Sequence, residues 1–91
     1  MKYVTLMGSR RTAEEQSYIW ATMRMWSALP EEQRQQVRSL VEDIALTPVE
    51  GRALYDVMVR GLTPHSVAER VGMPVKRLYS MRREFIDRYA I

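Results

Sequence analysis

Basic side chains gather in one short stretch near the C-terminal end of the sequence. The first 45 residues carry six basic and six acidic side chains, so the formal net charge of +3 belongs to residues 46–91. A local cationic cluster attracts a polyphosphate backbone. The alternative is a solvated helix face, and both interpretations fit the charge alone. Residues 70–83 hold five basic side chains and no acidic one: Arg70, Lys76, Arg77, Arg82 and Arg83.

The residue types that enzymes and metal sites need are scarce. The chain has no cysteine and one histidine, His65, and a single histidine does not assemble a metal site. Pairs of glutamates at 14–15 and 31–32 fall in the first turns of predicted helices, where the helix dipole favours acids. No glycine-rich phosphate loop and no Ser/His/Asp set is visible. We therefore predict a protein that is not an enzyme and uses no cofactor and no metal.

Length and composition indicate a single domain. The chain has 91 residues, of which 46% are hydrophobic and 27% are charged, and it has no low-complexity tract. No apolar run approaches the roughly 18 residues that a membrane span requires, so no membrane contact is expected. Because the lack of cysteine suits a reducing compartment, we expect a cytoplasmic protein.

Capping residues mark where helices begin. Thr12 followed by Glu15 is a capping box, in which each residue satisfies a backbone N–H of the other. Two Thr-Pro pairs, at 47–48 and 63–64, place a cap directly before a proline at the first helical position. These signals predict helix starts without reference to any distant part of the chain.

Two glycines mark where helices end. Gly61 and Gly72 adopt positive φ at little cost, and a last helix begins at or near Pro74. Apolar residues recur with the 3.6-residue period between these limits. The sequence therefore predicts an all-α domain of about five helices, at about residues 12–28, 30–45, 48–60, 64–71 and 74–89.

The first predicted helix has apolar residues on more than one face. A surface helix of a small monomer normally keeps one side polar. One explanation is that this helix lies in the core; the other is that its second face meets a partner chain, where Trp, Tyr and Met are enriched. The residues concerned, which are the candidates for a homodimer or partner interface, are Tyr18, Trp20, Met23 and Trp26.

The spacing of residues 64–81 fits a helix-turn-helix. Counted from Pro64, Ala68 takes the fifth place, where two helices cross closely, and Gly72 takes the ninth, in the turn. A continuous amphipathic helix is excluded, because Gly72 and Pro74 would break it. We predict a C-terminal helix-turn-helix, over about 64–71 and 74–89, packed on an N-terminal helical hairpin. The apolar places are filled by Val67, Val71, Met73, Leu78 and Met81.

Residues 46–86 resemble a known class of module. "LT" before a Glu- and Arg-bearing helix, "GLT" leading into "VAERVG", and a basic last helix are similar to the helix-turn-helix of LuxR-type regulators and of the fourth region of sigma factors. Small phage and mobile-element regulators also use this module. Two departures stand out: Pro74 and Arg77 replace the serine and threonine often found there, and the extra C-terminal dimerisation helix of LuxR-type modules is missing.

A helix-turn-helix places its second helix in the major groove, with its N-terminal residues towards the base edges. Leu78, Met81 and Phe85 are then expected to face inward. The expected base contacts are Val75, Lys76, Tyr79, Ser80 and Arg83. The expected phosphate contacts are Thr63, His65, Ser66, Arg77 and Arg82, which fix position without reading sequence.

The expected organisation of the domain has three parts. Residues 1–11 form a flexible arm, residues 12–45 a helical hairpin for the core or for dimerisation, and residues 46–91 the DNA-binding module. One such module buries only about 600–1,000 Å² on DNA. Specific binding would therefore need a homodimer on a two-fold site, or docking beside another protein such as RNA polymerase.

We expect sequence-specific binding of double-stranded DNA, as in a small transcriptional regulator or in a phage factor for packaging or replication. The alternative is a protein-interaction adaptor of the same fold, for example one that contacts RNA polymerase. In that case the basic cluster would meet an acidic protein surface, and tryptophans of the first helix would anchor the contact. Salt dependence separates the two, because phosphate neutralisation makes binding weaken steeply with salt.

Overall fold

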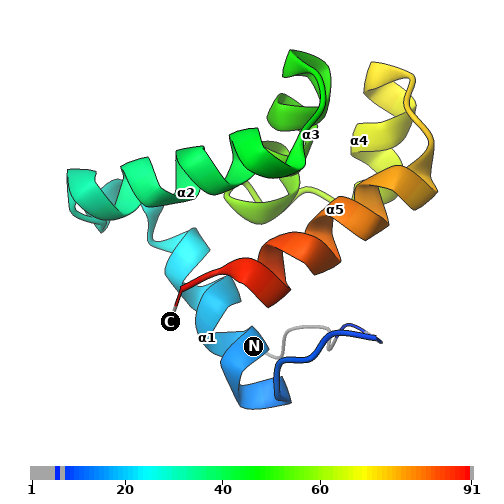
Figure 1. Cartoon of the computed structure of the whole chain (residues 1–91). Helices are drawn as coiled ribbons and strands as arrows, with labels where there is room; N and C mark the ends of the chain where they lie inside the picture. The colour runs from blue at the N-terminus through cyan, green and yellow to red at the C-terminus, as the bar shows by residue number, and fades with distance from the viewer. Residues whose placement is uncertain (1–5, 7, 91) are drawn as a thin grey trace.

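Five helices and one short 3-10 segment make up the part of the chain that the structure describes. The computed structural model describes residues 6 and 8–90, and it contains no strand within them (Figure 1). The all-α class predicted from the sequence is confirmed. The elements are α1 (Ala13–Arg24), the 3-10 segment η1 (Trp26–Ala28), α2 (Glu31–Ile44), α3 (Pro48–Met58), α4 (Pro64–Val71) and α5 (Val75–Arg88).

Threonine side chains begin α1, α3 and α4 at the positions that the sequence predicts. Thr12 Oγ1 accepts a hydrogen bond from the N–H of Glu15 at 3.1 Å, and the Glu15 carboxylate accepts one from the N–H of Thr12 at 2.9 Å. Thr47 and Thr63 each accept in the same way from the N–H three residues on. These caps satisfy backbone donors that have no partner inside the helix.

The first helix is shorter than predicted. α1 ends at Arg24, and the chain then tightens into η1 instead of continuing as α-helix to residue 28. The Thr22 hydroxyl donates to the carbonyl of the residue four places back at 2.8 Å, and the N–H of Met25 donates to the Thr22 carbonyl at 3.1 Å. This second bond spans three residues, which is the spacing of a 3-10 turn. α1 and η1 together cover the predicted range.

A short connection, residues 72–74, joins α4 to α5. Gly72 has a φ of +73°, in the left-handed region that glycine alone adopts without strain. The N–H groups of Gly72 and Met73 both donate to the carbonyl of Ala68, at 2.9 and 3.0 Å. These bonds close α4 and turn the chain sharply, so that α5 packs back against α4.

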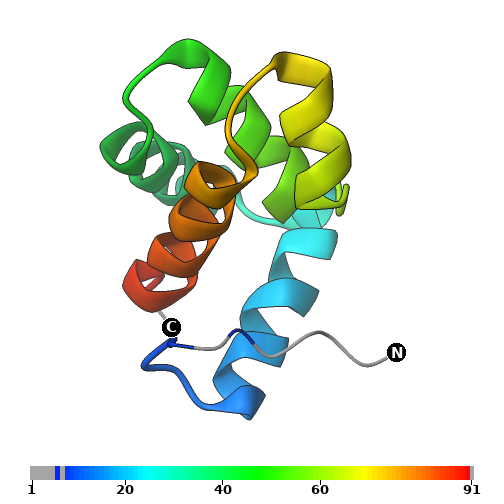
Figure 2. The ribbon, with the colours of Figure 1, turned by 90° about the vertical axis from the view of Figure 1, so that its right-hand side faces the viewer.

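Helices α3, α4 and α5 contact one another, and α2 covers α3 and α5 (Figures 1 and 2). The view in Figure 2 looks onto α4 and the N-terminal end of α5, which lie side by side. Each of the three mutually packed helices contributes fully buried side chains, so the core is continuous between them. These side chains include Leu54 of α3, Val67 of α4, and Leu78, Met81 and Phe85 of α5.

The structure differs from the expected N-terminal hairpin. α1 packs mainly on α3, whereas α2 packs on α3 and α5, and the two helices diverge in Figure 1. Leu29 and Pro30 between them are extended, with ψ of 143° and 147°. This extended segment carries α2 away from α1. Ile19 and Met23, which are fully buried on α1, therefore join the common core instead of packing on a hairpin partner.

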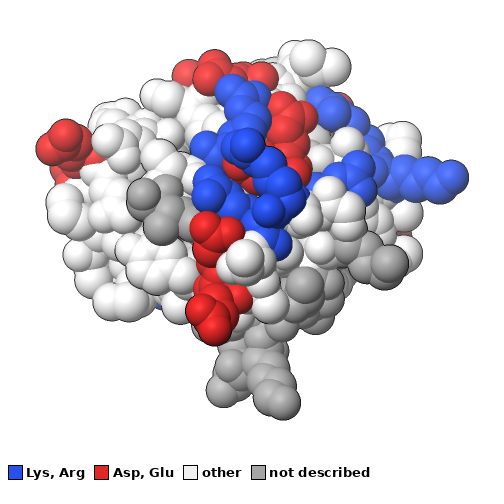
Figure 3. All heavy atoms as spheres, turned by 60° about the horizontal axis from the view of Figure 1, so that its bottom comes forward, with Lys and Arg blue, Asp and Glu red and all other residues white. Residues whose placement is uncertain are grey.

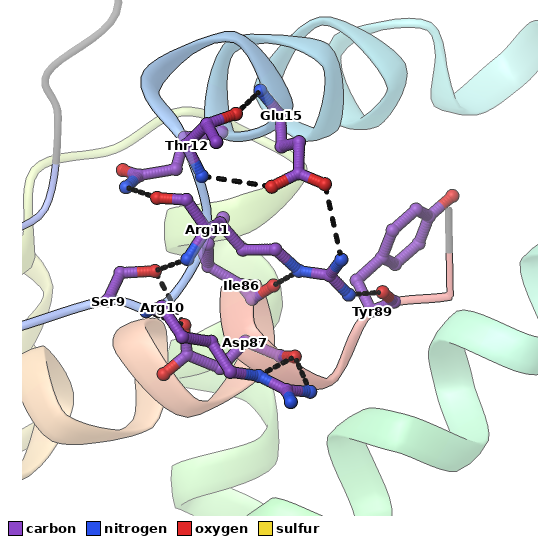
Figure 4. Close-up of polar contacts among 9 residues, drawn as sticks. Ser9, Arg10, Arg11, Thr12, Glu15, Ile86, Asp87 and Tyr89 are labelled. Atoms are coloured by element: carbon purple, nitrogen blue, oxygen red, sulfur yellow. Dashed lines mark hydrogen bonds and ion pairs between the residues drawn. The ribbon is translucent and has the colours of Figure 1, made fainter.

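The described part of the N-terminal arm is attached to α5 (Figure 4). The Ser9 hydroxyl donates to Oδ1 of Asp87 at 2.5 Å, and Nη2 of Arg10 donates to the Asp87 carbonyl at 2.7 Å. Arg11 donates to the carbonyl of Ile86 at 3.2 Å and to that of Tyr89. The last carbonyls of a helix have no intrahelical partner, so the two arginines supply their missing donors.

The arm also reaches the core and the exposed side of α5. Leu6 is buried, and its N–H donates to Oε1 of the buried Gln16 at 2.7 Å. Gly8, with a φ of +80°, lies against the side chain of Arg83. A flexible arm was expected for residues 1–11; of these, residues 1–5 and 7 lie outside the described residues, and the others are held by the contacts above.

Candidate nucleic-acid interface

α5 turns one side away from the core. Leu78, Met81 and Phe85 are fully buried, so the residues on the opposite side of the helix point outward. We call this outward set the α5 stripe. Its members are Lys76, Tyr79, Ser80 and Arg83.

The five expected base-contact residues differ in exposure. Lys76 and Arg83 are exposed, Tyr79 is 37% exposed, and Ser80 is half-buried. Val75 is half-buried and packs against the core, so only part of its side chain is free for an apolar contact. The structure thus brings four of the five together as the stripe and places Val75 at its edge.

Three cations of α5 have no polar partner in the part of the chain that the structure describes. Lys76, Arg82 and Arg83 make neither an ion pair nor a hydrogen bond with another described residue. Two other described cations, Arg10 and Arg24, form no such ion pair but donate to backbone carbonyls. Unneutralised charge is therefore concentrated on one helix, where a polyanion would find donors available.

Pairing decides which cations are available to a ligand. Figure 3 shows the side of the molecule that lies at the bottom of Figure 1, where Lys and Arg side chains form a band with acidic side chains above and below it. Cations next to carboxylates keep less net charge than their number implies. Whether a basic side chain can bind a ligand therefore depends on its own contacts.

Arg77 is the clearest example of a paired cation on α5. Its Nε and Nη2 donate to the two carboxylate oxygens of Glu50 at 3.2 and 3.1 Å, and Nη2 also donates to the carbonyl of Ile44 at 3.1 Å. The hydrogen bond from Arg77 and then that from the N–H of Leu46 hold the pKa of Glu50 below its usual range. Arg77, an expected phosphate contact, thus ties α5 to the connection between α2 and α3.

Arg82 is held by aromatic rings instead of acids. Its guanidinium lies 4.9 Å from the centroid of the Tyr79 ring and 5.9 Å from that of Trp20. Its Nε is buried and has no hydrogen-bond partner among the described residues, and burial lowers the pKa of Arg82. Cation–π contacts fix the orientation of a guanidinium without neutralising its charge. Arg82 therefore remains a charged and oriented group beside the stripe.

Tyr79 is fixed from two sides. The ring of His65, at the start of α4, meets it edge-on, with 5.6 Å between centroids and an interplanar angle of 75°, and Arg82 lies over it. Such edge-to-face pairs are favoured by the ring quadrupoles. His65 is exposed, so α4 and α5 present one continuous surface here.

The other two residues expected to contact phosphate at the start of α4 are used in its cap. Thr63 Oγ1 accepts from the N–H of Ser66 at 3.4 Å and donates to the Ser66 hydroxyl at 2.9 Å, which in turn donates to the Thr63 carbonyl at 3.0 Å. Both hydroxyls are engaged locally. His65 is thus the residue of this group whose side chain faces outward without such a bond.

The four candidate partner-interface residues separate into core and surface. Met23 is fully buried and Trp20 nearly so, and both belong to the hydrophobic core. Trp26 is half-buried against Tyr55, with 5.7 Å between the ring centroids. Tyr18 lies on the surface. Of the four, only Tyr18 offers most of its side chain to a partner.

Two exposed apolar residues were missed by the sequence analysis. Leu46, in the connection between α2 and α3, is 81% exposed, and Val49, in the first turn of α3, is half exposed. A shallow hollow beside them is lined by Val41, Ala45 and Pro48. The sequence signal was weak, since single apolar residues at a helix start read equally well as core.

A buried carboxylate was also missed. Asp56 of α3 is 1% exposed, and Arg70 of α4 donates to its Oδ2 at 2.7 Å. Arg52 and Arg60 lie four residues before and after it on the sequence and also pair with it. That i, i+4 spacing was the available signal.

Comparison with known protein families, with curated proteins and with solved structures finds no match. Within residues 6 and 8–90, no helix has the length and apolar character needed to cross a membrane. The same residues contain no group of three His, Asp or Glu side chains arranged to hold a metal ion.

Proposed function

We propose that the protein binds double-stranded DNA sequence-specifically, with α4 and α5 as a helix-turn-helix and α5 in the major groove. The observation that carries this proposal is that Lys76, Arg82 and Arg83 have no polar partner among the described residues. A major groove about 12 Å wide admits one α-helix, and its phosphates complement such a face. The function that fits best is that of a small transcriptional regulator.

The stripe residues take distinct roles in this proposal. Lys76 and Arg83 donate to guanine O6 and N7, and Ser80 bonds to a base edge. Tyr79 stacks on a sugar or bonds to a phosphate from the orientation that His65 and Arg82 give it. His65 and Arg82 themselves contact phosphates on the flank of the groove. Arg77 is left out, because its Nε and Nη2 already donate to Glu50 and to the Ile44 carbonyl and its side chain is only 29% exposed.

One small module gives modest affinity alone. We propose that specificity comes from a homodimer on a two-fold site or from docking beside a second DNA-bound protein such as RNA polymerase. Trp20 and Met23 are buried, so they do not supply that contact. Tyr18 and Met25, both exposed on or next to α1, are the available apolar side chains.

The test is enrichment of random-sequence duplexes by the purified protein at two salt concentrations. We expect a recovered motif and a steep loss of binding as salt rises. Lys76→Gln/Arg83→Gln is expected to weaken binding at least about 30-fold, since each contact contributes about 1–3 kcal/mol. Arg34→Gln/Arg38→Gln on α2 removes the same charge elsewhere and should retain the motif. Loss of binding in both variants, or in neither, would contradict the proposal.

A second candidate is a protein-interaction adaptor. The observation that favours it is the exposure of Leu46 and Val49 beside a shallow apolar hollow. Such a patch suits a partner with an apolar anchor. It would be preferred if the enrichment recovered no motif while Leu46→Asp abolished binding to a captured protein that Arg83→Gln still bound.

A further inference from the structure

One cluster of arginines lies outside the α5 stripe. Asp56 Oδ2 accepts from Arg70 at 2.7 Å, whereas Arg60 and Arg52 approach Oδ1 at the longer distances of 3.4 and 3.5 Å. The side chain of Asp56 is buried, and those of all three arginines are more than half exposed. One carboxylate thus faces three guanidiniums that lie at the surface of α3, α4 and the connection between them.

The cluster has more cations and donors than Asp56 requires. Arg70 alone makes the short bond that satisfies the buried carboxylate. Each guanidinium has five N–H donors in a fixed fork. The side chains of Arg52 and Arg60 are 72% and 51% exposed, so donors that Asp56 does not use are open to solvent, and the two like charges repel each other. Arg52 and Arg60 are each held by one long contact to Asp56, and Arg70 already balances its charge. Their unused donors therefore suit an additional oxyanion.

The position of the cluster relates it to the proposed DNA-binding face. Arg60 lies in the connection between α3 and α4, three residues before the cap Thr63 and five before His65, which touches the stripe. Arg70 of α4 reaches Asp56 of α3, whereas His65 of the same helix meets Tyr79 of α5, so α4 contacts both the cluster and the stripe.

We propose that Arg52 and Arg60 bind backbone phosphates of the same duplex, while Arg70 keeps Asp56 neutralised. This inference rests on the proposed function. Arginine suits the role because its planar fork matches phosphate bidentately. These contacts carry no sequence information. The cluster therefore contributes affinity and fixes the orientation of the module, whereas the stripe reads the bases.

The test compares the salt dependence of duplex binding in matched variants. Arg52→Gln/Arg60→Gln keeps Arg70 and thus the short bond to Asp56. Its control is Arg34→Gln/Arg38→Gln, which removes two arginines that share the exposed Glu31 on α2. Because the slope of log affinity against log salt is about −0.9 per phosphate contacted, we expect the first variant to lose about two units of slope and the control none. The base preference should not change.

A charge-conserving variant keeps the test independent of folding. Arg52→Lys/Arg60→Lys is expected to retain most of the slope and to lose affinity severalfold, since lysine contacts phosphate as a point charge. Circular dichroism identifies any variant that is unfolded. If the glutamine variant is unfolded, a wild-type slope and wild-type affinity in the folded lysine variant would overturn the inference.

Two outcomes separate this inference from the proposed function. A wild-type slope in folded Arg52→Gln/Arg60→Gln, with binding lost in Lys76→Gln/Arg83→Gln, would overturn the phosphate role of the cluster alone. No salt-dependent duplex binding by the wild-type protein would instead remove the proposed function. Inorganic phosphate is the second probe: thermal stabilisation that depends on Arg52 and Arg60, together with an unchanged DNA slope, would assign the cluster to a free anion and overturn the inference.

Discussion

α2 and α5 are amphipathic helices of the same length that pack against each other. Their outer sides differ in whether the basic side chains are paired with acidic ones. α2 carries four acidic and two basic side chains, and both arginines, Arg34 and Arg38, donate to Glu31 at 2.8 and 2.9 Å. α5 carries five basic and two acidic side chains. Only Arg77 and Arg88 among its cations form ion pairs with described residues.

Pairing of the charged side chains, more than their number, determines which helix is available to a ligand. A surface ion pair contributes little to stability, but it neutralises both partners. On α2 both arginines pair with Glu31 of their own helix. On α5 the cations of the outer side have no such partner, and this difference is the basis of the proposed DNA-binding role.

The largest expected effect is the loss of unfolding free energy when a buried side chain of either helix is shortened. In this respect the inner faces of α2 and α5 should differ only in magnitude. Phe85 of α5 is fully buried and stacks on Tyr89, with 5.9 Å between ring centroids, and Val37 of α2 is 1% exposed. Phe85→Ala is expected to cost about 3–5 kcal/mol of unfolding free energy by cavity formation. Val37→Ala should also destabilise, but less, because fewer atoms are removed. Urea denaturation measures both, and a neutral effect at either site would contradict the described core.

The next prediction separates paired from unpaired cations on α5 itself. Arg77→Gln removes the bidentate contact to Glu50 and is expected to cost about 1–2 kcal/mol of stability. It should leave the salt slope of DNA binding unchanged, because Arg77 is not proposed to touch phosphate. Arg83→Gln should do the reverse. A reduced slope in folded Arg77→Gln would show that pairing does not withhold an arginine from DNA.

Stability at acid pH provides a third distinction. The hydrogen bond from Arg77 lowers the folded-state pKa of Glu50 below the usual 4.5, so ionised Glu50 stabilises the protein above that pH. The contribution is lost as pH falls through the lowered pKa. Glu50→Gln should therefore show a smaller decrease in melting temperature between about pH 5 and 3. An unchanged decrease would mean that the Arg77–Glu50 contact is weak.

Glu31 on α2 is the natural comparison. Hydrogen bonds from Arg38 and then Arg34 also lower its pKa, but the group is exposed, and solvent screens its ion pairs. Glu31→Gln is expected to change the decrease in melting temperature at acid pH less than Glu50→Gln does. A larger effect of Glu31→Gln would contradict the distinction between the partly buried Arg77–Glu50 pair and the exposed pairs of Glu31.

The smallest expected effect concerns the arm. Arg10→Gln removes the guanidinium bonds to the Asp87 carbonyl at the end of α5, an exposed contact, and should cost about 0.5–1 kcal/mol. Hydrogen exchange of the last turn of α5 should accelerate, while exchange in α2 should not. Equal acceleration in both helices would indicate global destabilisation instead of loss of this helix end.

Local chemistry explains what the sequence predicted well. The caps Thr12, Thr47 and Thr63 and the turn at Gly72 depend on residues a few places apart, so they were visible without tertiary knowledge. The inward side of α5 followed from its apolar spacing. Each of these features is decided within one or two helical turns.

Long-range contacts explain what the sequence did not predict. Arg77 and Glu50 are 27 residues apart, and Ser9 and Asp87 are 78 apart, so neither pairing leaves a local pattern. The divergence of α1 and α2 was not predicted for a related reason, because the direction set by two extended residues at 29–30 is not encoded in helix periodicity. Trp20 looked suited to an interface as well as to the core, and only its burial in the core, with Arg82 of α5 beside its ring, decided between them.

The most direct test of the central claim is an NMR titration of the protein with a mixed-sequence duplex of about two helical turns at low salt. We expect the amide shifts to concentrate at His65 and along Lys76–Arg83, to reverse when salt is raised, and to leave α2 unaffected. Shifts that concentrate on α2 or around Leu46, or no shifts at all, would contradict the claim that unpaired cations make α5 the DNA-binding helix.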